Sequence, residues 1–255
     1  MIRTSKYVLY DIVRNRFVIL YAVFLLVATL GMMNLDSDPG KSMLSLLNVV
    51  LLIVPLVSVV FTTTHFFNSY EFIELLLSQP VERKSIFLAE YFSVSLALTS
   101  AFLFGVGMPV LLLNFNDASL YLILSGVLLT FVFVALAFGA SLSTRDKAKG
   151  IGIAMLFWLY FSLLYDGVVL YIIYSFSDYP LEKITLVLVS LNPVDLARII
   201  ILLKLDVSAL MGYTGAFYRE FFGTNLGIFY SFLFLMAWIA VPLMLSLKRF
   251  EKKDI

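Results

Sequence analysis

NSYEFIELLLSQPVERK, residues 68–84, lies between two long apolar stretches and differs in character from both. Asn68, followed three residues later by Glu71, has the pattern of a capping box that opens a helix. Pro80 disfavours the helical conformation at Gln79, so the helix should end there. About ten residues span roughly 15 Å, half the thickness of the hydrocarbon core of a bilayer. The stretch therefore predicts a short helix between two membrane spans.

This short helix, residues 69–79, is predicted to be amphipathic. Its apolar residues are Phe72, Ile73, Leu75, Leu76 and Leu77, and its polar residues are Glu71, Glu74 and Ser78. Such a helix either lies on the membrane surface or offers one face to a protein partner. We predict that residues 71–78 form the contact through which an ATPase moves this chain. The alternative is a helix that only anchors the loop.

The composition is that of an integral membrane protein. The chain is 62% hydrophobic and 14% charged, whereas a soluble domain is about half apolar and a quarter charged. A net charge of +1 gives no reason to expect nucleic acid as a partner. Cysteine is absent, and His65 is the single histidine with no carboxylate near it in the sequence. The sequence therefore predicts no metal ligands in this chain.

Outward from residues 68–84, apolar runs predict an all-α, polytopic fold with six transmembrane helices in a single domain, residues 1–255. The predicted spans are residues 17–33, 43–66, 86–113, 119–142, 150–176 and 225–247. Residues 1–16 alternate basic and apolar side chains, as expected of an elbow helix at the membrane surface. The residues between 105 and 109, GVGMP, should distort the third span. Small residues at the facing ends of the fourth and fifth spans predict a close hairpin.

The distribution of Lys and Arg predicts the orientation. Thirteen lie in the N-terminal segment, the loops after the second and fourth spans and the C-terminal tail, and five lie in the opposite set of segments. The positive side of a membrane protein is cytoplasmic. Both termini and the helix at 69–79 are thus expected in the cytoplasm, and the segment 177–224 outside it.

Two helices are expected within the external segment 177–224. Residues 181–189 form one, and Asn192 caps a second, residues 194–204, with Pro193 at its start. Neither is long enough to cross a bilayer, so we expect both to lie in the outer interface. There, Asn192, Pro193, Asp195 and Arg198 could contact a periplasmic partner, or the helices could simply cover the membrane domain.

Asp166 lies near the middle of the fifth span. An ionisable residue at that depth is costly and normally faces protein or water. It is a candidate for a conformational latch or for a proton or ion site. The alternative is a carboxyl group that is satisfied by a neighbouring Tyr hydroxyl.

Motifs for bond-breaking chemistry are absent. The sequence has no G-x-x-x-x-G-K-[ST], no G-x-S-x-G and no H-E-x-x-H. We therefore expect a non-catalytic chain without a bound cofactor, whose energy comes from a partner or a gradient.

The layout over the whole chain resembles the membrane subunit of ABC exporters with six spans per protomer. EFIELLLSQPV, residues 71–81, is similar to the coupling helix of that family and the turn after it. The resemblance implies a cytoplasmic ABC ATPase dimer that binds ATP and Mg²⁺, a second copy of this chain, and a location in the bacterial inner membrane.

A narrower resemblance covers LYDGVVL, residues 164–170, and LNPVDLAR, residues 191–198. These stretches are similar to the permeases of systems that mature nitrous oxide reductase. The resemblance implies a periplasmic β-helical copper-handling partner and a role in assembling the copper site. One alternative is an ABC exporter permease for a lipid, drug, sulfur compound or polysaccharide. Another is an ion-driven secondary transporter that uses Asp166, although the two-half repeat usual in such proteins is not evident. A membrane scaffold without transport is a third.

Overall fold

The computed structural model describes residues 9–10, 12–35, 38–176, 182–205 and 225–252. Within this part of the chain all regular structure is helical, and six helices or continuous helix series are long and apolar enough to cross a membrane. They are α2 (Arg16–Leu35), α3 (Pro39–Asn68), α5 (Arg83–Phe102) with η1 (Leu103–Gly107) and α6 (Met108–Leu113), α7 (Asp117–Leu142), α8 (Lys147–Leu159) with η2 (Tyr160–Leu164) and α9 (Tyr165–Ser175), and α13 (Asn225–Lys252). The all-α fold and the six predicted spans are confirmed. Most of the predicted elbow helix lies outside the described residues, but Ile12 is buried in the core.

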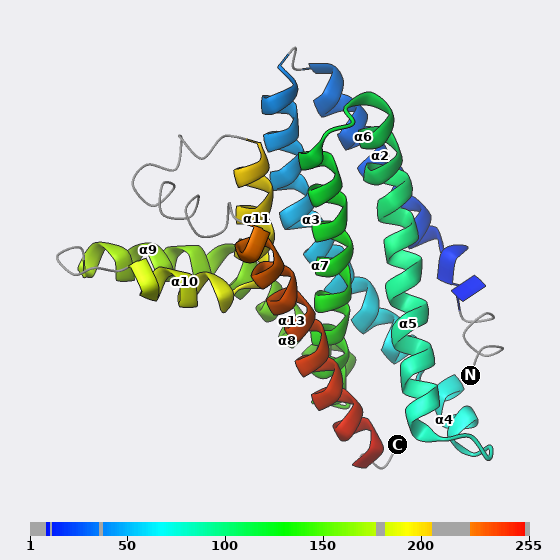
Figure 1. Cartoon of the computed structure of the whole chain (residues 1–255). Helices are drawn as coiled ribbons and strands as arrows, with labels where there is room; N and C mark the ends of the chain where they lie inside the picture. The colour runs from blue at the N-terminus through cyan, green and yellow to red at the C-terminus, as the bar shows by residue number, and fades with distance from the viewer. Residues whose placement is uncertain (1–8, 11, 36–37, 177–181, 206–224, 253–255) are drawn as a thin grey trace.

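Helix α7 lies at the centre of the bundle (Figure 1) and packs against α3, α5, α8, α11 and α13. Small side chains make this possible, because lipid supplies no hydrophobic drive and close backbone approach must supply van der Waals contact instead. A Cβ at Gly126 would lie 2.3 Å from the ring of Phe102, which is fully buried. The predicted hairpin of the fourth and fifth spans is confirmed by the packing of α7 on α8.

Two spans contain a π-helical segment. The distortion predicted around Gly105 is present as η1, and it lies where α2 crosses the third span. A Cβ at Gly105 would lie 2.6 Å from the Cβ of Leu25 and 2.8 Å from the carbonyl oxygen of Ala22. The second segment, η2, ends two residues before Asp166 and was not predicted. Such π-bulges are frequent at functional sites.

The short helix between the second and third spans is present as α4 (Tyr70–Leu77). The predicted capping box is wrong, because α3 continues through Asn68 and Ser69 is the single residue between the helices. The Ser69 N–H donates to the carbonyl oxygen of His65 at 2.8 Å, and no side chain caps α4. Asn68 instead accepts a hydrogen bond from Lys147 Nζ at 2.7 Å.

Helices α10 (Glu182–Ser190) and α11 (Pro193–Lys204) are close to the predicted ranges and meet at an angle of 111°. Asn192 caps α11 as predicted, accepting from the Val194 N–H at 3.0 Å. The expected place of α11 in the outer interface stays a prediction, but the helix does not lie apart from the bundle. Apolar residues surround this helix, and it packs against α7, α13 and α3 with Leu196, Ala197 and Ile201 fully buried.

The pair α10–α11 has the geometry of a re-entrant hairpin. Its corner lies beside the middle of the fifth span, where Asn192 Nδ2 donates to the carbonyl oxygen of Phe161 at 3.0 Å. Its far end lies beside the first turns of α7, where Lys204 Nζ is 5.1 Å from the ring centroid of Tyr121. Helix α10 runs alongside α9 (Figure 1). Residues 177–181 and 206–224 of the predicted external segment lie outside the described residues.

Candidate functional site

Helix α4 exposes two apolar side chains and two carboxylates. Phe72 is 46% exposed and Leu75 is 57% exposed, and Glu71 and Glu74 are exposed beside them. Phe72 and Leu75 are three residues apart, so they lie on one side of the helix. The sequence predicted a single apolar face, but the structure divides these residues between an exposed side, with Phe72 and Leu75, and a side that packs on the bundle.

The other half of that face anchors α4 to the bundle. Ile73 is 1% exposed, and Leu76 and Leu77 pack partly buried against the core. Ser78 ends the helix, with its Oγ donating to the carbonyl oxygen of Leu75 at 2.7 Å. The predicted end before Pro80 is thus confirmed.

A buried polar contact joins the two spans that carry α4. His65 Nε2 in α3 lies 3.2 Å from Glu90 Oε2 in α5, and the Glu90 side chain is 5% exposed. Ser69 Oγ, at the joint between α3 and α4, lies 3.5 Å from the same imidazole nitrogen. His65 therefore has a carboxylate neighbour that the sequence analysis missed. His65 lies just before residues 68–84 and Glu90 just after them, so the two spans place both side chains at a similar depth. This similar depth could have predicted the contact from the sequence.

Further contacts tie the ends of other helices to this region. Arg83 Nη1 donates to the carbonyl oxygen of Glu251 at 3.2 Å, and Lys84 Nζ lies 3.4 Å from Glu251 Oε1. The start of α5 is thus held to the end of α13, while Asn68 and Lys147 hold the end of α3 to the start of α8. These contacts hold the ends of four spans together in pairs beside α4.

A second polar cluster lies at the corner of the re-entrant hairpin. Arg198 Nη1 lies 2.6 Å from Asp166 Oδ2 and 3.1 Å from Asp195 Oδ1. Asn192 Nδ2 donates to Asp195 Oδ2 at 2.9 Å. In the part of the chain that the structure describes, Asp166 therefore pairs with an arginine of α11 rather than with the Tyr hydroxyl that the sequence offered as an alternative. The neighbouring Tyr165 hydroxyl donates to the carbonyl oxygen of Leu188.

The burial of this cluster bears on its predicted contact with a periplasmic protein. Asn192, Pro193 and Asp195 are buried, and only Arg198 is partly exposed. Their contact with a partner stays a prediction, but in this chain Asn192 and Arg198 join α11 to the fifth span, and Asp195 supports both of them. Asp166 and Arg198 thus form an ion pair between α9 and α11. A role as a conformational latch stays a prediction.

Metal coordination has no support in the part of the chain that the structure describes. No group of three or more His, Cys, Asp or Glu side chains comes together there. The two polar clusters are instead hydrogen-bonded pairs that join helices.

Comparison with known proteins places this arrangement in a family. The profile described as "ABC-2 family transporter protein" matches residues 9–255. The chain belongs to the ABC-2 family. Members of this family are permease subunits of ABC transporters, which agrees with the six spans of this chain and with the resemblance drawn from residues 71–81.

Two curated relatives of this chain carry the name "Probable ABC transporter permease protein NosY". The protein from Pseudomonas aeruginosa is 32% identical over 148 residues, which is 54% of this chain and 54% of that one. The protein from Stutzerimonas stutzeri is 29% identical over 192 residues, which is 70% of this chain and 67% of that one. The match thus spans about half the length of the first relative and two thirds of the second.

Proposed function

We propose that this permease subunit receives the movement of a cytoplasmic ABC ATPase at α4 and transmits it to the re-entrant hairpin α10–α11. The observation that carries the proposal is the exposure of Phe72 and Leu75 on a helix whose opposite side is anchored by the buried Ile73. An exposed apolar pair flanked by carboxylates has the chemistry of a protein contact. Since this chain lacks an ATP-binding motif, the ATP and Mg²⁺ belong to the partner.

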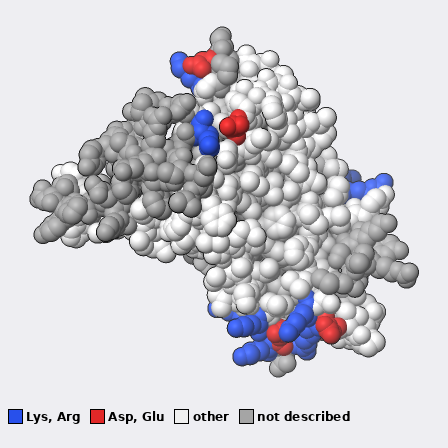
Figure 2. All heavy atoms as spheres, in the orientation of Figure 1, with Lys and Arg blue, Asp and Glu red and all other residues white. Residues whose placement is uncertain are grey.

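The proposed orientation puts α4 and both ends of the chain in the cytoplasm, in a bacterial inner membrane. Lys and Arg gather at the end of the bundle where α13 finishes (Figure 2), as the positive-inside rule requires of a cytoplasmic face. Helix α4 lies toward the same end (Figure 1). The hairpin α10–α11 then opens toward the periplasm.

The proposed path of movement is built from direct contacts. Helix α4 joins α3 and α5 beside the His65–Glu90 contact. Both helices pack on α7, and α7 packs on α11. Arg198 then connects α11 to Asp166 in the fifth span. Packed interiors move as rigid pieces rather than deforming continuously, so a push at α4 would shift α11 through α7.

Two copies of the chain would form the membrane core, because a symmetric pair of ATPase subunits offers two equivalent docking positions. The similarity of residues 164–170 and 191–198 to nitrous oxide reductase maturation permeases, together with relatives named NosY, supports a narrower proposal. In it, the hairpin changes shape beneath a periplasmic β-helical copper-handling protein during assembly of the copper site. A route for a substrate through the bundle is not required.

ATP turnover by the purified complex tests the docking proposal. Phe72→Asp places a charge in the exposed apolar pair, so it should uncouple ATP turnover from the membrane subunit while the bundle remains folded. Phe72→Leu keeps the apolar surface and should retain coupling. Gln79→Asp adds a carboxylate at an exposed position just beyond α4 and serves as the matched control. Normal coupling in Phe72→Asp would contradict the proposal.

Identification of the native partners tests the narrower proposal. A complex purified from its own cells should contain an ABC ATPase and a copper-handling periplasmic protein. An ATPase recovered with export components instead would favour a permease for a lipid, drug, sulfur compound or polysaccharide. Activity that needs an ion gradient and no ATPase would contradict the whole assignment.

A further inference from the structure

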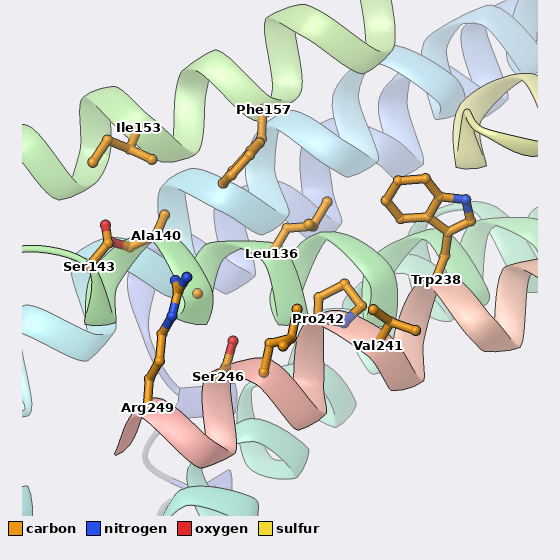
Figure 3. Close-up of a pocket in the computed structure, with 12 residues that line it drawn as sticks. Leu136, Ala140, Ser143, Ile153, Phe157, Trp238, Val241, Pro242, Ser246 and Arg249 are labelled. Atoms are coloured by element: carbon orange, nitrogen blue, oxygen red, sulfur yellow. The ribbon is translucent and has the colours of Figure 1, made fainter. Parts of the chain in front are cut away.

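A groove runs between α7, α8 and α13 (Figure 3), and these helices finish or begin at the end of the bundle toward which α4 lies (Figure 1). Its volume is about 370 Å³, within the range of roughly 300–1,000 Å³ typical of small-molecule sites. Its wall is mainly apolar, formed by Leu136, Ile153, Phe157, Val241, Pro242 and Leu245. Val241 and Leu245 are more than half exposed, so the groove opens on the outer side of the bundle.

The floor of the groove depends on close approach of α13 to α7. A Cβ at Gly139 would lie 3.1 Å from Ser246 Oγ. Small residues at the cytoplasmic end of α7 therefore let the last span approach here, while Ile153 and Phe157 of α8 stand apart from it and leave the space between (Figure 3).

The two ends of the groove differ in chemistry. Trp238 closes one end, with its Nε1 donating to the carbonyl oxygen of Ser190 at 3.1 Å. Arg249 lies at the other end, and its guanidinium reaches across toward Ser143 (Figure 3). Trp238 and Arg249 are eleven residues apart in one helix, which corresponds to about 16 Å. One leaflet contributes about 15 Å of hydrocarbon, so the groove has the length of a single leaflet.

Positive charge gathers at the open end of the groove. Among the described residues, Arg249, Lys248 and Lys252 make no ion pair, and the carboxylate of Glu251 in the same turn is paired with Lys84. These three cations line a second cavity of about 420 Å³ that adjoins the groove at Leu245 and Arg249. Basic pockets between membrane helices at the cytoplasmic side suit anionic lipid headgroups.

We propose that this groove binds one anionic phospholipid of the leaflet on the α4 side. One acyl chain lies along Leu136, Phe157 and Val241, and the phosphate pairs with Arg249, with Lys248 and Lys252 close by. The apolar length sets the fit of the chain, and the unpaired cations select the headgroup charge. Both parts are needed, because an exposed cation alone would also hold free phosphate, and an apolar groove alone would hold a neutral lipid.

Quenching of tryptophan fluorescence tests this site in the full-length chain. The chain contains two Trp residues, so Trp158→Phe leaves Trp238, at the closed end of the groove, as the reporter. Phosphatidylglycerol with brominated acyl chains should quench it saturably. Brominated phosphatidylcholine should bind more weakly, and glycerol 3-phosphate, which lacks acyl chains, should not compete at concentrations where phosphatidylglycerol does.

Variants separate the headgroup from the groove. Arg249→Ala should weaken phosphatidylglycerol binding about fivefold, as expected for one cation near a membrane surface, and Arg249→Lys should retain most of it. Arg145→Ala removes an exposed cation outside the groove and should leave binding unchanged. Ser143→Phe should block the mouth and reduce quenching by either lipid. Equal affinity for both lipids in the unaltered groove, or quenching unaffected by both Arg249→Ala and Ser143→Phe, would overturn the proposal.

Discussion

The guanidinium of Arg198 lies 2.6 Å from a carboxylate oxygen of Asp166, joining the re-entrant helix α11 to the fifth span. The two residues are 32 positions apart in the chain. The contact explains how an ionisable residue is accommodated in the middle of a membrane helix, since such residues normally pair within the protein. It also fixes the corner of α10–α11 at the point where the π-helical segment η2 ends.

Loss of either partner of this contact should destabilise the chain. Arg198→Ala removes the cation that pairs with Asp166 and Asp195. Asp166→Ala removes one of the two carboxylates that pair with Arg198. We expect each change to lower the free energy of unfolding by about 1–3 kcal/mol, as for a partly buried group left unsatisfied. Reversible unfolding in mixed micelles measures this.

The double variant Arg198→Met with Asp166→Leu removes both charges and should be more stable than Arg198→Met alone. Arg145→Ala, at an exposed position, should change stability by no more than about 0.5 kcal/mol. If the effects of Arg198→Met and Asp166→Leu, each measured alone, add strictly in the double variant, the contact contributes nothing.

The His65–Glu90 contact should matter for coupling as well as for stability. Glu90→Leu removes the carboxylate beside the partly buried imidazole of His65 and should lower stability by about 1–3 kcal/mol. His65→Phe combined with Glu90→Leu replaces both polar groups by apolar ones, so it should recover stability. If the contact also transmits movement, the double variant stays folded but stimulates its ATPase less than the native chain does. Full stimulation in the folded double variant would limit the contact to a structural role.

The crossing of α2 over η1 should tolerate no side chain at Gly105. A Cβ there meets backbone of α2, including the Ala22 carbonyl oxygen at 2.8 Å, so Gly105→Ala should cost about 1–3 kcal/mol through overpacking. Gly31 in α2 has nothing within 4 Å of such a Cβ, so Gly31→Ala should be neutral or stabilising. Thermal unfolding of the two variants distinguishes them, and equal effects would contradict the close approach.

The predicted orientation is accessible to labelling, because the native chain has no cysteine. Phe115 lies in the loop before α7 and is 72% exposed, whereas Ser78 is exposed at the end of α4. An impermeant thiol reagent added to spheroplasts should label Phe115→Cys directly and Ser78→Cys only after the membrane is opened. The reverse labelling pattern would show that the chain has the opposite orientation and that α4 is not cytoplasmic.

The sequence predicts the spans well because membrane crossing depends on a property that each segment carries by itself. In lipid, the backbone N–H and C=O groups of an apolar run as long as α7 must form their hydrogen bonds within a helix, whichever helices pack beside it. The short helix α4 was predicted for the same reason, from Pro80 and the polar residues around it. The start of α4 was not predicted, because α3 continues through Asn68 and this residue therefore does not cap a new helix.

Contacts between distant segments were not predictable in this way. The pairings of His65 with Glu90 and of Asp166 with Arg198 depend on how helices cross, and a single sequence carries no signal of which residues pair. The burial of α11 was missed for a related reason. Its Asp195 and Arg198 suggested a solvated side, yet they compensate each other and Asp166 inside the protein.

The most direct measurement of the central claim is cross-linking from α4 to the ATPase. The cysteine-free chain allows Phe72→Cys and Leu75→Cys to be modified with a short thiol-to-amine cross-linker in the assembled complex. We expect both positions to cross-link to the ATPase subunit, with a yield that changes when ATP is bound, and Phe115→Cys at the opposite end to give no such product. Cross-linking to the ATPase from Phe115→Cys, or none from either α4 position in an assembled complex, would contradict the account.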